Sequence, residues 1–358
     1  MNKSTQPNNT TRAHLVGHYH AYPRLQPEDI FKFIFQSALG CEHLVSSEAA
    51  ALEYINREYA SLPDGPEPFT EALDGAYARV HLSCLRDGLK TETLARLFCL
   101  SAKKESDGRA TLEQKLQVAR DLVADGSLPF DLGDFDQRLA AWRDAGYPAV
   151  HHSDNFRAAY RPAYRVIAKR YADYLRLFTR IDKLLARGDA VVAIEGGSAS
   201  GKSTLAGILQ EVYDCNLLHM DDFFLRPEQR TPTRLAEVGG NLDRERFFDE
   251  VVRPLGRREE IRYRRFDCSS QALGEPITIA PKKLTVVEGV YAMHPAFGEY
   301  YNLSVFLDID PARQKDRILK RNGLPLANRF FEEWIPLENR YFSQMQIRSR
   351  CTECFPML

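Results

Sequence analysis

The spacing of hydrophobic residues changes near residue 188. Before that point, apolar residues recur with a helical period, so we predict that residues 15–187 are almost wholly helical. One of these helices is predicted to begin near Tyr164 and to run to Gly188. After residue 189, short apolar runs typical of buried strands alternate with helical stretches, a pattern that indicates a parallel sheet with crossover helices.

This pattern predicts three segments. Residues 1–14 are polar and are expected to form a disordered tail, and residues 15–187 a mostly α-helical accessory domain. Residues 188–358 are expected to form an α/β domain with a parallel sheet and flanking helices. The strands of that sheet are predicted at residues 190–194, 216–220, 284–287 and 303–308, with a helix from 244 that stops at Pro254 and another from 330 to 341 that bends at Pro336.

The amino-acid composition limits which classes of binding partner we expect. The net charge of −1 gives no overall attraction to nucleic acid or to an anionic membrane surface. No apolar run is long enough to span a bilayer, and the seven scattered cysteines indicate reduced thiols in a cytoplasmic protein. The pair Cys351 and Cys354 is interpreted as two thiols in a terminal strand or tail. We therefore expect the protein to bind a small molecule and to bind neither nucleic acid nor a membrane. A homo-oligomer is compatible with this composition.

A phosphate-binding loop opens the second domain. Residues 194–205 read I-E-G-G-S-A-S-G-K-S-T-L, and the segment from Gly196 to Ser203 fits the P-loop pattern between a strand and a helix. In such a loop, Lys202 reaches the β- and γ-phosphates of ATP, and the Ser203 hydroxyl binds Mg²⁺. The residues predicted to bind ATP are Gly196, Gly197, Ser198, Ala199, Ser200, Gly201, Lys202, Ser203 and Thr204.

Two further strands end in carboxylates. Asp221 and Asp222 follow the strand at 216–220, at a position that faces the phosphate site in a parallel sheet. Asp221 is the candidate to accept the proton of an acceptor hydroxyl, with Asp222 as the second choice, while both could instead cap the next turn. Glu288 ends the strand L-T-V-V-E and is predicted to face the metal.

An arginine-rich helix follows the last predicted strand. Arg313, Arg317 and Arg321 are spaced by four residues after Asp310, so they lie along one helix face. They are either a solvated basic face or a lid whose arginines close on the transferred phosphate, with Arg317 and Arg321 as the better lid candidates. The chain has no N-K-x-D motif after residue 203, and this favours a kinase over a GTPase switch.

These motifs together resemble the uridine kinase/phosphoribulokinase family. The segments that carry the resemblance are G-G-S-A-S-G-K-S-T, M-D-D-F-F, N-L-D at 241–243, V-V-E-G-V at 286–290 and the run from F-L-D-I-D to R-I-L-K-R. The resemblance implies an ATP- and Mg²⁺-dependent kinase that phosphorylates a hydroxyl of a small molecule. It implies Asp221 as the base, Arg317 and Arg321 as lid residues, and Asp243 as a contact to ribose hydroxyls.

The acceptor is left open by the residues that would hold it. Phe224 and Phe266, with Asp222 and Asp243, are the substrate candidates, but F-D-C-S-S-Q at 266–271 replaces the Y-D-F-x-x-H of uridine kinases. A nucleoside-type acceptor is favoured; a sugar, sugar phosphate or vitamin precursor is the alternative. The arginines at 262, 264 and 265 suit an anionic acceptor or belong to the surface of a hairpin. An ATP-sensing regulator without turnover is a third hypothesis.

Some motifs receive no role from the sequence. G-H-Y-H (17–20), G-C-E-H (40–43) and H-H-S-D-N-F-R (151–157) combine histidine, cysteine and carboxylates, but their spacing fits no standard metal or nucleophile site. They are interpreted as capping or buried structural groups. The helical domain is expected to dock on the kinase or to shape its acceptor site. W-I-P-L-E-N-R-Y-F (334–342) also has no derived role.

Overall fold

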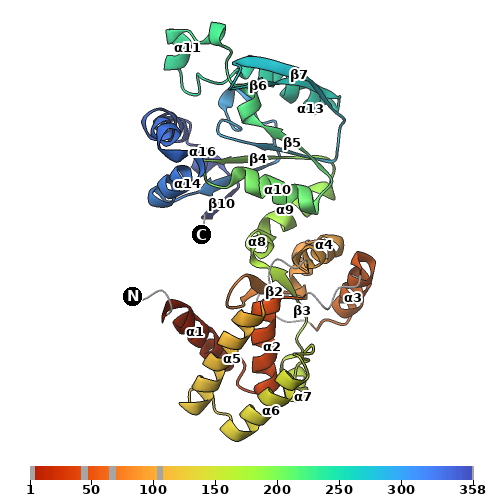
Figure 1. Cartoon of the computed structure of the whole chain (residues 1–358). Coiled ribbons are helices and arrows are strands. Elements are labelled where there is room, and N and C mark those ends of the chain that lie inside the picture. The colour runs from red at the N-terminus through yellow and green to blue at the C-terminus, as the bar shows by residue number, and fades with distance from the viewer. Residues whose placement is uncertain (1–4, 42–46, 64–69, 103–107, 357–358) are drawn as a thin grey trace. The chain divides into compact units, whose positions relative to one another are not determined.

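The computed structural model describes residues 5–41, 47–63, 70–102 and 108–356. The chain divides into two compact units, an N-terminal unit of residues Met1–Asp182 and a C-terminal unit of residues Lys183–Leu358. Figure 1 draws the first in red to yellow-green and the second in green to blue. Among the described residues, no helix has the length and apolar character needed to cross a bilayer.

The N-terminal unit combines helices with a small antiparallel sheet. The sheet has the order β1-β2-β3, formed by Thr70–Ala72, Tyr77–His81 and Tyr164–Ala168. Phe31 stacks on Trp142 in the core, with ring centroids 5.4 Å apart. The helices are α1 (Thr5–Ala21), α2 (Pro27–Leu39), α3 (Glu48–Ala60), α4 (Thr91–Ser101), α5 (Arg109–Ala124), α6 (Leu132–Asp144), α7 (Asp154–Tyr160) and α8 (Lys169–Ala172), with a 3₁₀ helix at Leu82–Asp87.

The expectation of a disordered tail is wrong for residues 5–14, which belong to helix α1. Residues 1–4 lie outside the described part of the chain. Thr11, Leu15 and His18 are all buried, and their spacing places them on one face of the helix. The Thr11 hydroxyl also donates a hydrogen bond to the Asp74 carboxylate. The segment is polar in composition, yet it has one buried face that holds it in the fold.

The helix predicted from Tyr164 onward begins instead with a strand. Strand β3 pairs antiparallel with β2, and Ile167 lies opposite Ala78. The β-branched residues Val166 and Ile167 favour an extended backbone, and both are buried. Helical structure resumes after β3, first in the short helix α8 (Lys169–Ala172) and then in α9 (Leu175–Leu185). The first unit is therefore mostly helical, with three strands that the sequence analysis did not predict.

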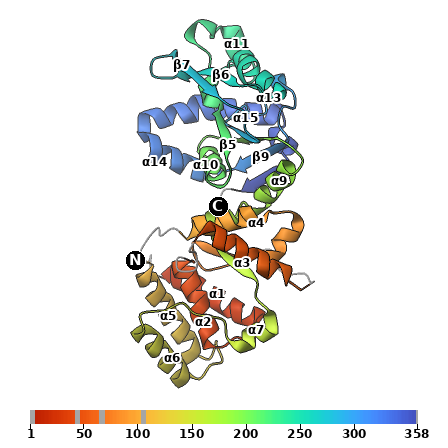
Figure 2. The ribbon, with the colours of Figure 1, turned by 90° about the vertical axis from the view of Figure 1, so that its right-hand side faces the viewer.

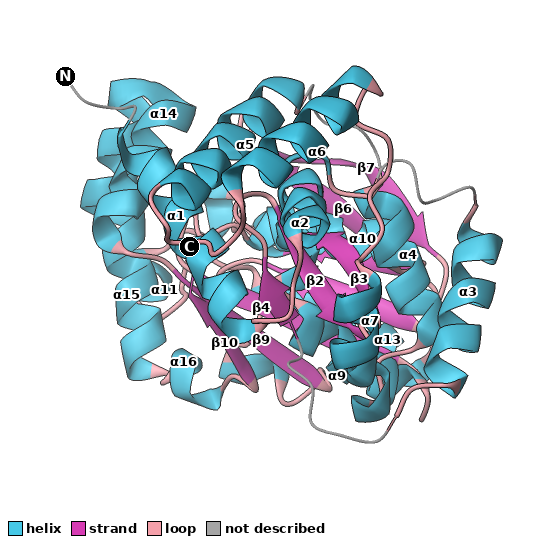
Figure 3. Cartoon of the chain, turned by 90° about the horizontal axis from the view of Figure 1, so that it is seen from below, coloured by secondary structure: helices cyan, strands magenta, loops and turns pink. Residues whose placement is uncertain are grey.

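The fold class predicted for the C-terminal unit is confirmed by a five-stranded parallel sheet. Its order is β10-β9-β4-β8-β5, and Figure 3 shows β10, β9 and β4 as neighbours. Val192, Ala193 and Ile194 of the central strand β4 are fully buried, as expected for a strand covered on both faces. The bounds are β4 (Ala190–Gly196), β5 (Cys215–His219), β8 (Leu284–Glu288), β9 (Leu303–Asp308) and β10 (Glu353–Pro356).

Helices and a separate hairpin complete the C-terminal unit. Helix α10 packs against β4, β5 and β8, and Figure 2 shows α14 and α15 in the same unit. The hairpin consists of β6 (Ile261–Asp267) and β7 (Ala272–Ile279). The helices are α10 (Lys202–Val212), α11 (Pro232–Ala236), α12 (Arg244–Phe247), α13 (Arg253–Arg257), α14 (Pro311–Arg329), α15 (Ile335–Gln344) and α16 (Ile347–Arg350), with short 3₁₀ helices at Met220–Phe223, Pro227–Gln229 and Pro295–Phe297.

Pro254 and Pro336 each lie just after a π-helical turn, inside a longer helical segment. Pro254 does not stop the helix as predicted, because a π-helical turn at Phe248–Val252 leads directly into α13. A second π-helical turn, Phe330–Trp334, leads into α15 in the same way before Pro336. Each proline occupies the first turn of the α-helix that follows, where a missing N–H group is tolerated.

Replacing Leu15 with alanine should lower the free energy of unfolding of the N-terminal unit by about 2–5 kcal/mol, because the fully buried side chain would leave a cavity. The exposed His20 of the same helix is the control. Replacing it with alanine should change the free energy of unfolding by less than about 0.5 kcal/mol. Urea unfolding in a Trp334→Phe background measures both, since Trp142 then reports only on the N-terminal unit. Equal, small effects would contradict a packed helix α1.

Candidate active site

The register of the parallel sheet brings the predicted site residues to one edge. Glu288 at the end of β8 lies opposite Ile194 of β4 and opposite His219 of β5. The P-loop begins at the end of β4, and Asp221 follows β5 directly. The carboxyl ends of three neighbouring strands therefore supply the loop, a carboxylate and the aspartates, at the edge where parallel α/β sheets bind ligands.

The P-loop turns on two glycines with positive φ. Gly196 has a φ of 142° and Gly201 a φ of 96°, which other residues rarely adopt. A Cβ atom on Gly196 would lie 2.5 Å from the carbonyl oxygen of Leu307 on β9, so the loop passes too close to that strand for a side chain. Ala199, at the tip of the loop, also has a positive φ of 60°.

Lys202 and Ser203 begin helix α10 directly after the loop. The Lys202 Nζ atom donates hydrogen bonds to the carbonyl oxygens of Gly196 and Gly197, at 2.8 and 3.1 Å. The Ser203 hydroxyl donates to Glu288 Oε1 at 3.0 Å, and His219 Nδ1 lies 2.7 Å from the same oxygen. A hydroxyl and a carboxylate thus meet beside the loop, as in sites that hold Mg²⁺ next to a nucleotide.

Electrostatics keep Glu288 ionised although it is buried. Burial opposes its charge, but the hydrogen bond from His219, the charge of Lys202 and the bond from Ser203 together lower its pKa. The pKa of His219 is raised, mainly by its hydrogen bond to Glu288. Glu288 is therefore a charged oxygen donor, which is the ligand type that Mg²⁺ prefers.

The two adjacent aspartates have different surroundings. Asp222 Oδ2 accepts a hydrogen bond from the Tyr263 hydroxyl at 3.0 Å and pairs with Arg265 Nε at 3.3 Å. Asp221 is accessible to solvent, yet protein atoms crowd it, and this desolvation raises its pKa; Lys202 opposes the shift and Glu288 adds to it. Among the described residues, Asp221 thus has no such hydrogen-bond or ion-pair partner and interacts electrostatically with Lys202, whereas Asp222 is bound to the β6–β7 hairpin.

The other residues predicted to bind the substrate already make contacts within the protein. Asp243 is buried, caps helix α12 through the Arg246 N–H group and accepts a hydrogen bond from Gln229 at 3.0 Å. Phe266 is buried in β6, and the Arg230 guanidinium lies over its ring. Phe224 is half-buried and pairs through its backbone with Leu242. These residues shape the region beside Asp222.

The arginines of helix α14 differ in their surroundings, so one fits the lid hypothesis better and the other fits a solvated basic face. Arg317 is half-buried and donates a hydrogen bond to the Ala199 carbonyl at 3.1 Å, so it contacts the tip of the P-loop. Arg321 is exposed and lies over the ring of Phe330. Of the two lid candidates, only Arg317 is thus placed against the loop in the described structure.

Sequence reasoning missed the residues that hold the loop from outside. Both carboxylate oxygens of Glu338 accept hydrogen bonds from Ser198, one from its backbone N–H at 2.9 Å and one from its hydroxyl. Gln314 donates to the Ser198 carbonyl at 2.9 Å. Glu338 belongs to W-I-P-L-E-N-R-Y-F, so that segment was the available signal. Its role is to fix the tip of the P-loop.

The same segment also contacts the strand below the loop. Glu195 in β4 is fully buried; its Oε1 accepts hydrogen bonds from Tyr341 at 2.7 Å and from the Met293 N–H at 2.9 Å. Its other oxygen has no hydrogen-bond partner among the described residues. Burial raises the pKa of Glu195 to about 7. A carboxyl that is half neutral near pH 7 therefore sits directly behind the P-loop.

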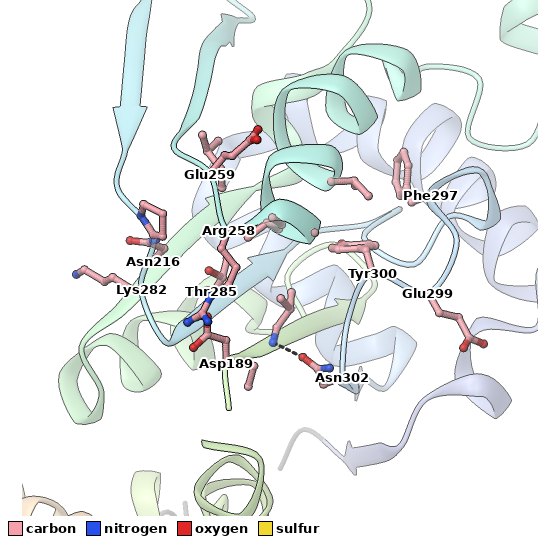
Figure 4. A pocket seen from close by; sticks show the side chains of 17 residues that line it. Asp189, Asn216, Arg258, Glu259, Lys282, Thr285, Phe297, Glu299, Tyr300 and Asn302 are labelled. Atoms are coloured by element: carbon pink, nitrogen blue, oxygen red, sulfur yellow. Dashed lines mark hydrogen bonds and ion pairs between the residues drawn. The ribbon is translucent and has the colours of Figure 1, made fainter. Parts of the chain in front are cut away.

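A hollow of the C-terminal unit lies at the opposite end of the sheet. It has a volume of about 590 Å³ and is lined by residues at the amino ends of the strands, among them Asp189, Asn216 and Asn302. Figure 4 shows these side chains and the hydrogen bond from the Val191 N–H to Asn302 Oδ1, 2.7 Å long. We place the candidate active site at the carboxyl end instead, because the phosphate-binding groups lie there.

The solved structures found by comparison each cover about half of this chain. No protein-family model and no curated protein matches the chain. Three solved structures resemble it: a "Possible Uridine Kinase" from Bacillus stearothermophilus (20% identity, 50% of this chain, 99% of that chain, TM-score 0.38), a "putative fructose transport system kinase" from Silicibacter sp. TM1040 (20%, 47%, 90%, 0.39) and TT1252 from Thermus thermophilus (18%, 47%, 88%, 0.28). Two of the three are thus described as kinases of small molecules.

Replacing Glu338 with glutamine should weaken ATP binding about tenfold, because an amide N–H₂ group would face one of the two Ser198 donors and loosen the loop. Glu332, exposed in the preceding π-helical turn, is the matched control, and its glutamine variant should bind ATP like the wild type. Titration with a fluorescent ATP analogue measures both. An unchanged dissociation constant in Glu338→Gln would contradict a role in holding the loop.

The raised pKa of Glu195 predicts a pH-dependent stability. The folded carboxyl binds its proton more tightly than the unfolded one, so its contribution is full below about pH 4.5 and is lost as the pH rises to about 7. Glu195→Gln should remove this loss, making the C-terminal unit more stable than the wild type at pH 8 by up to about 3 kcal/mol. At pH 5 the two should be nearly equal. Urea unfolding followed by Trp334 fluorescence in a Trp142→Phe background tests this, and a constant difference across pH would contradict it.

Proposed function

We propose that the C-terminal unit is an ATP- and Mg²⁺-dependent kinase that transfers the γ-phosphate to a hydroxyl of a small metabolite. The observation that carries the proposal is the convergence of the P-loop, Lys202, Ser203, Glu288 and Asp221 at the carboxyl edge of the sheet. A loop that binds nucleotide without catalysis needs no solvent-accessible carboxylate beside the lysine.

Each residue has a distinct task in this reaction. The backbone N–H groups of the loop and the Lys202 ammonium bind the phosphates, and Arg317 lies close enough to the loop to reach the transferred group. Ser203 and Glu288 supply the oxygens suited to hold Mg²⁺. When bound, Mg²⁺ neutralises charge that develops on the phosphates during transfer.

Asp221 is proposed to orient the acceptor hydroxyl and to take its proton. Its raised pKa makes it a stronger base than an ordinary aspartate, and its carboxylate remains accessible to an incoming substrate. The charge of Lys202 opposes that rise in pKa and so favours the ionised carboxylate, which is the form that accepts a proton.

For the acceptor, we propose a nucleoside-type alcohol first, on the strength of the motif resemblance. One observation favours the alternative of a non-nucleoside sugar, sugar phosphate or vitamin precursor. Asp243, the expected ribose contact, is buried and already bound to Gln229 and the Arg246 backbone. Arg265, with 57% of its side chain exposed beside Asp222, offers a positive charge to an anionic acceptor.

Asp221→Asn should lower turnover at least 100-fold while ATP still binds, because only the proton-accepting group is removed. Asp222→Asn is the matched control and should retain turnover within about tenfold, since Asp222 is engaged by Tyr263 and Arg265. ATP consumption is measured with nucleosides, pentose phosphates, pantothenate and amino-alcohols as acceptors, against Lys202→Ala as the background.

Three outcomes separate the hypotheses. Turnover with a nucleoside supports the first acceptor class, and turnover only with another alcohol supports the second. If no alcohol stimulates ATP consumption above the Lys202→Ala rate, the kinase proposal fails. If the protein is instead an ATP-sensing regulator, the wild-type protein and the Asp221→Asn variant should bind ATP equally well.

A further inference from the structure

The buried histidines of the N-terminal unit have partners inside the fold. His152 Nδ1 lies 2.8 Å from Asp29 Oδ1, and His18 Nδ1 lies 3.0 Å from Glu71 Oε1. These two histidines are therefore structural groups, as their motifs were interpreted. The situation differs at the amino ends of the strands in the C-terminal unit, where buried polar side chains line the hollow described above.

A row of three side chains forms the floor of this hollow. Val191 of β4 lies opposite Thr285 of β8, and Thr285 lies opposite Asn216 of β5. Residues in register on neighbouring strands point to the same face of a sheet, so the three side chains lie side by side. All three line the hollow. Its floor therefore carries a hydroxyl and an amide next to an apolar group.

Two oxygen atoms of this floor are available to a ligand. Asn216 Nδ2 donates to the Ala280 carbonyl at 2.8 Å, which fixes the amide and leaves Oδ1 as its acceptor. Among the described residues, neither Asn216 Oδ1 nor the Thr285 hydroxyl has a hydrogen-bond partner. Only 8% of Asn216 and 2% of Thr285 is exposed, yet neither oxygen is fully enclosed, so both are accessible from the hollow. A ligand that supplies the missing partners is favoured there.

The walls of the hollow are apolar. Val252 and Leu255 lie one helical turn apart and line one side. Phe297 and Tyr300, both labelled in Figure 4, line it from the loop before β9. The Tyr300 hydroxyl donates to the Ala292 carbonyl at 2.7 Å, so the ring itself remains as contact surface. These walls suit the faces of an apolar ring.

Charged groups at the rim do not point to a charged ligand. Arg258 pairs with Asp189 at 2.5 Å, and the Lys282 ammonium is paired in the same way at 2.5 Å. Figure 4 shows the carboxylates of Glu259 and Glu299 away from the polar floor. The groups with unused hydrogen-bonding capacity at the floor are both uncharged. A charged ligand would therefore lose its hydration without gaining a countercharge there.

We propose that this hollow binds an uncharged small molecule that has an apolar ring and an N–H group beside a carbonyl. The ligand N–H donates to Asn216 Oδ1, its carbonyl accepts from the Thr285 hydroxyl, and its ring packs against Leu255 and Tyr300. The volume of about 590 Å³ is within the range of small-molecule sites. The site lies at the end of the sheet opposite the P-loop and is independent of the kinase proposal.

The test compares two probes that differ in one donor. 2-Quinolone is an uncharged fused ring with an N–H group beside a carbonyl, and 1-methyl-2-quinolone has the same ring without the N–H. Equilibrium dialysis against the full chain, read from the absorbance of the probes, measures binding. We expect 2-quinolone to bind with a Kd below about 1 mM. The methylated probe should bind at least about fivefold more weakly, because it leaves Asn216 Oδ1 without a donor.

Gly256→Leu should abolish the binding of 2-quinolone by filling the hollow. Gly256 lines the hollow on the same helical face as Val252, and a Cβ atom there would meet no atom within 4 Å. Gly207→Leu in α10 is the matched control, since Gly207 has equal space and lies outside the hollow. Thr285→Val keeps the shape of the side chain, loses the hydroxyl and should weaken binding about fivefold.

The proposal is overturned if 2-quinolone does not bind the wild type at about 1 mM, or if Gly256→Leu binds it as well as Gly207→Leu does. Equal binding of the two quinolones also contradicts it. If Gly256→Leu does not fold, Thr285→Val decides, and wild-type affinity in that variant overturns the proposal. Binding should persist in Lys202→Ala, which loses the P-loop lysine. Failure of either proposal therefore leaves the other one intact.

Discussion

The pairing of β8 with its two neighbours is the constraint on which the candidate active site depends. Its last residue, Glu288, faces Ile194 on one side and His219 on the other. Side chains on a strand alternate between the two faces of a sheet, so a shift of one residue in this pairing would turn Glu288 away from Ser203. The residues of β4 and β8 are buried on both faces of the sheet, so such a shift is unfavourable because closely packed side chains would have to repack on each face. The hydrophobic core thus fixes where the polar groups meet.

A second set of contacts controls the shape of the P-loop from outside the sheet. Glu338 and Gln314 hold Ser198, and Arg317 holds Ala199. Tyr341, on the same helix as Glu338, binds Glu195 one residue before the loop begins. Helices α14 and α15 therefore grip the loop at its tip and at its base. A movement of these helices would change how the backbone N–H groups of the loop are aimed.

Much of the sheet could be predicted from the sequence because its strands are short apolar runs that end in acidic residues or glycine. For Cys351 and Cys354 the sequence left a terminal strand and a tail as alternatives, since the polar residues around Cys354 give no such pattern; Cys354 lies in strand β10. Glu288 and Asp221 could be found because one ends a strand and the other lies two residues after a strand, both near a P-loop. Glu338 could not be found in this way. It lies 140 residues from Ser198 in the sequence, and only tertiary packing brings the two side by side. In the N-terminal unit, His18 and His152 looked isolated for the same reason, and β3 was hidden by a spacing that also fits a helix.

The placement of β10 at the edge of the sheet has a consequence for how this protein is handled. Its residues Glu353–Pro356 pair with β9 along Val305–Asp308, so they cover one side of a mostly buried and mostly apolar strand. A chain cut before residue 353 would leave the N–H and C=O groups on the β10 side of β9 without partners, while those on the other side still pair with β4. Unpaired strand edges of this kind recruit other chains by the same ladder of hydrogen bonds. Strand β10 therefore protects β9 from pairing with other chains. Pro356 has no backbone N–H group to donate, so it helps to end the ladder of hydrogen bonds there.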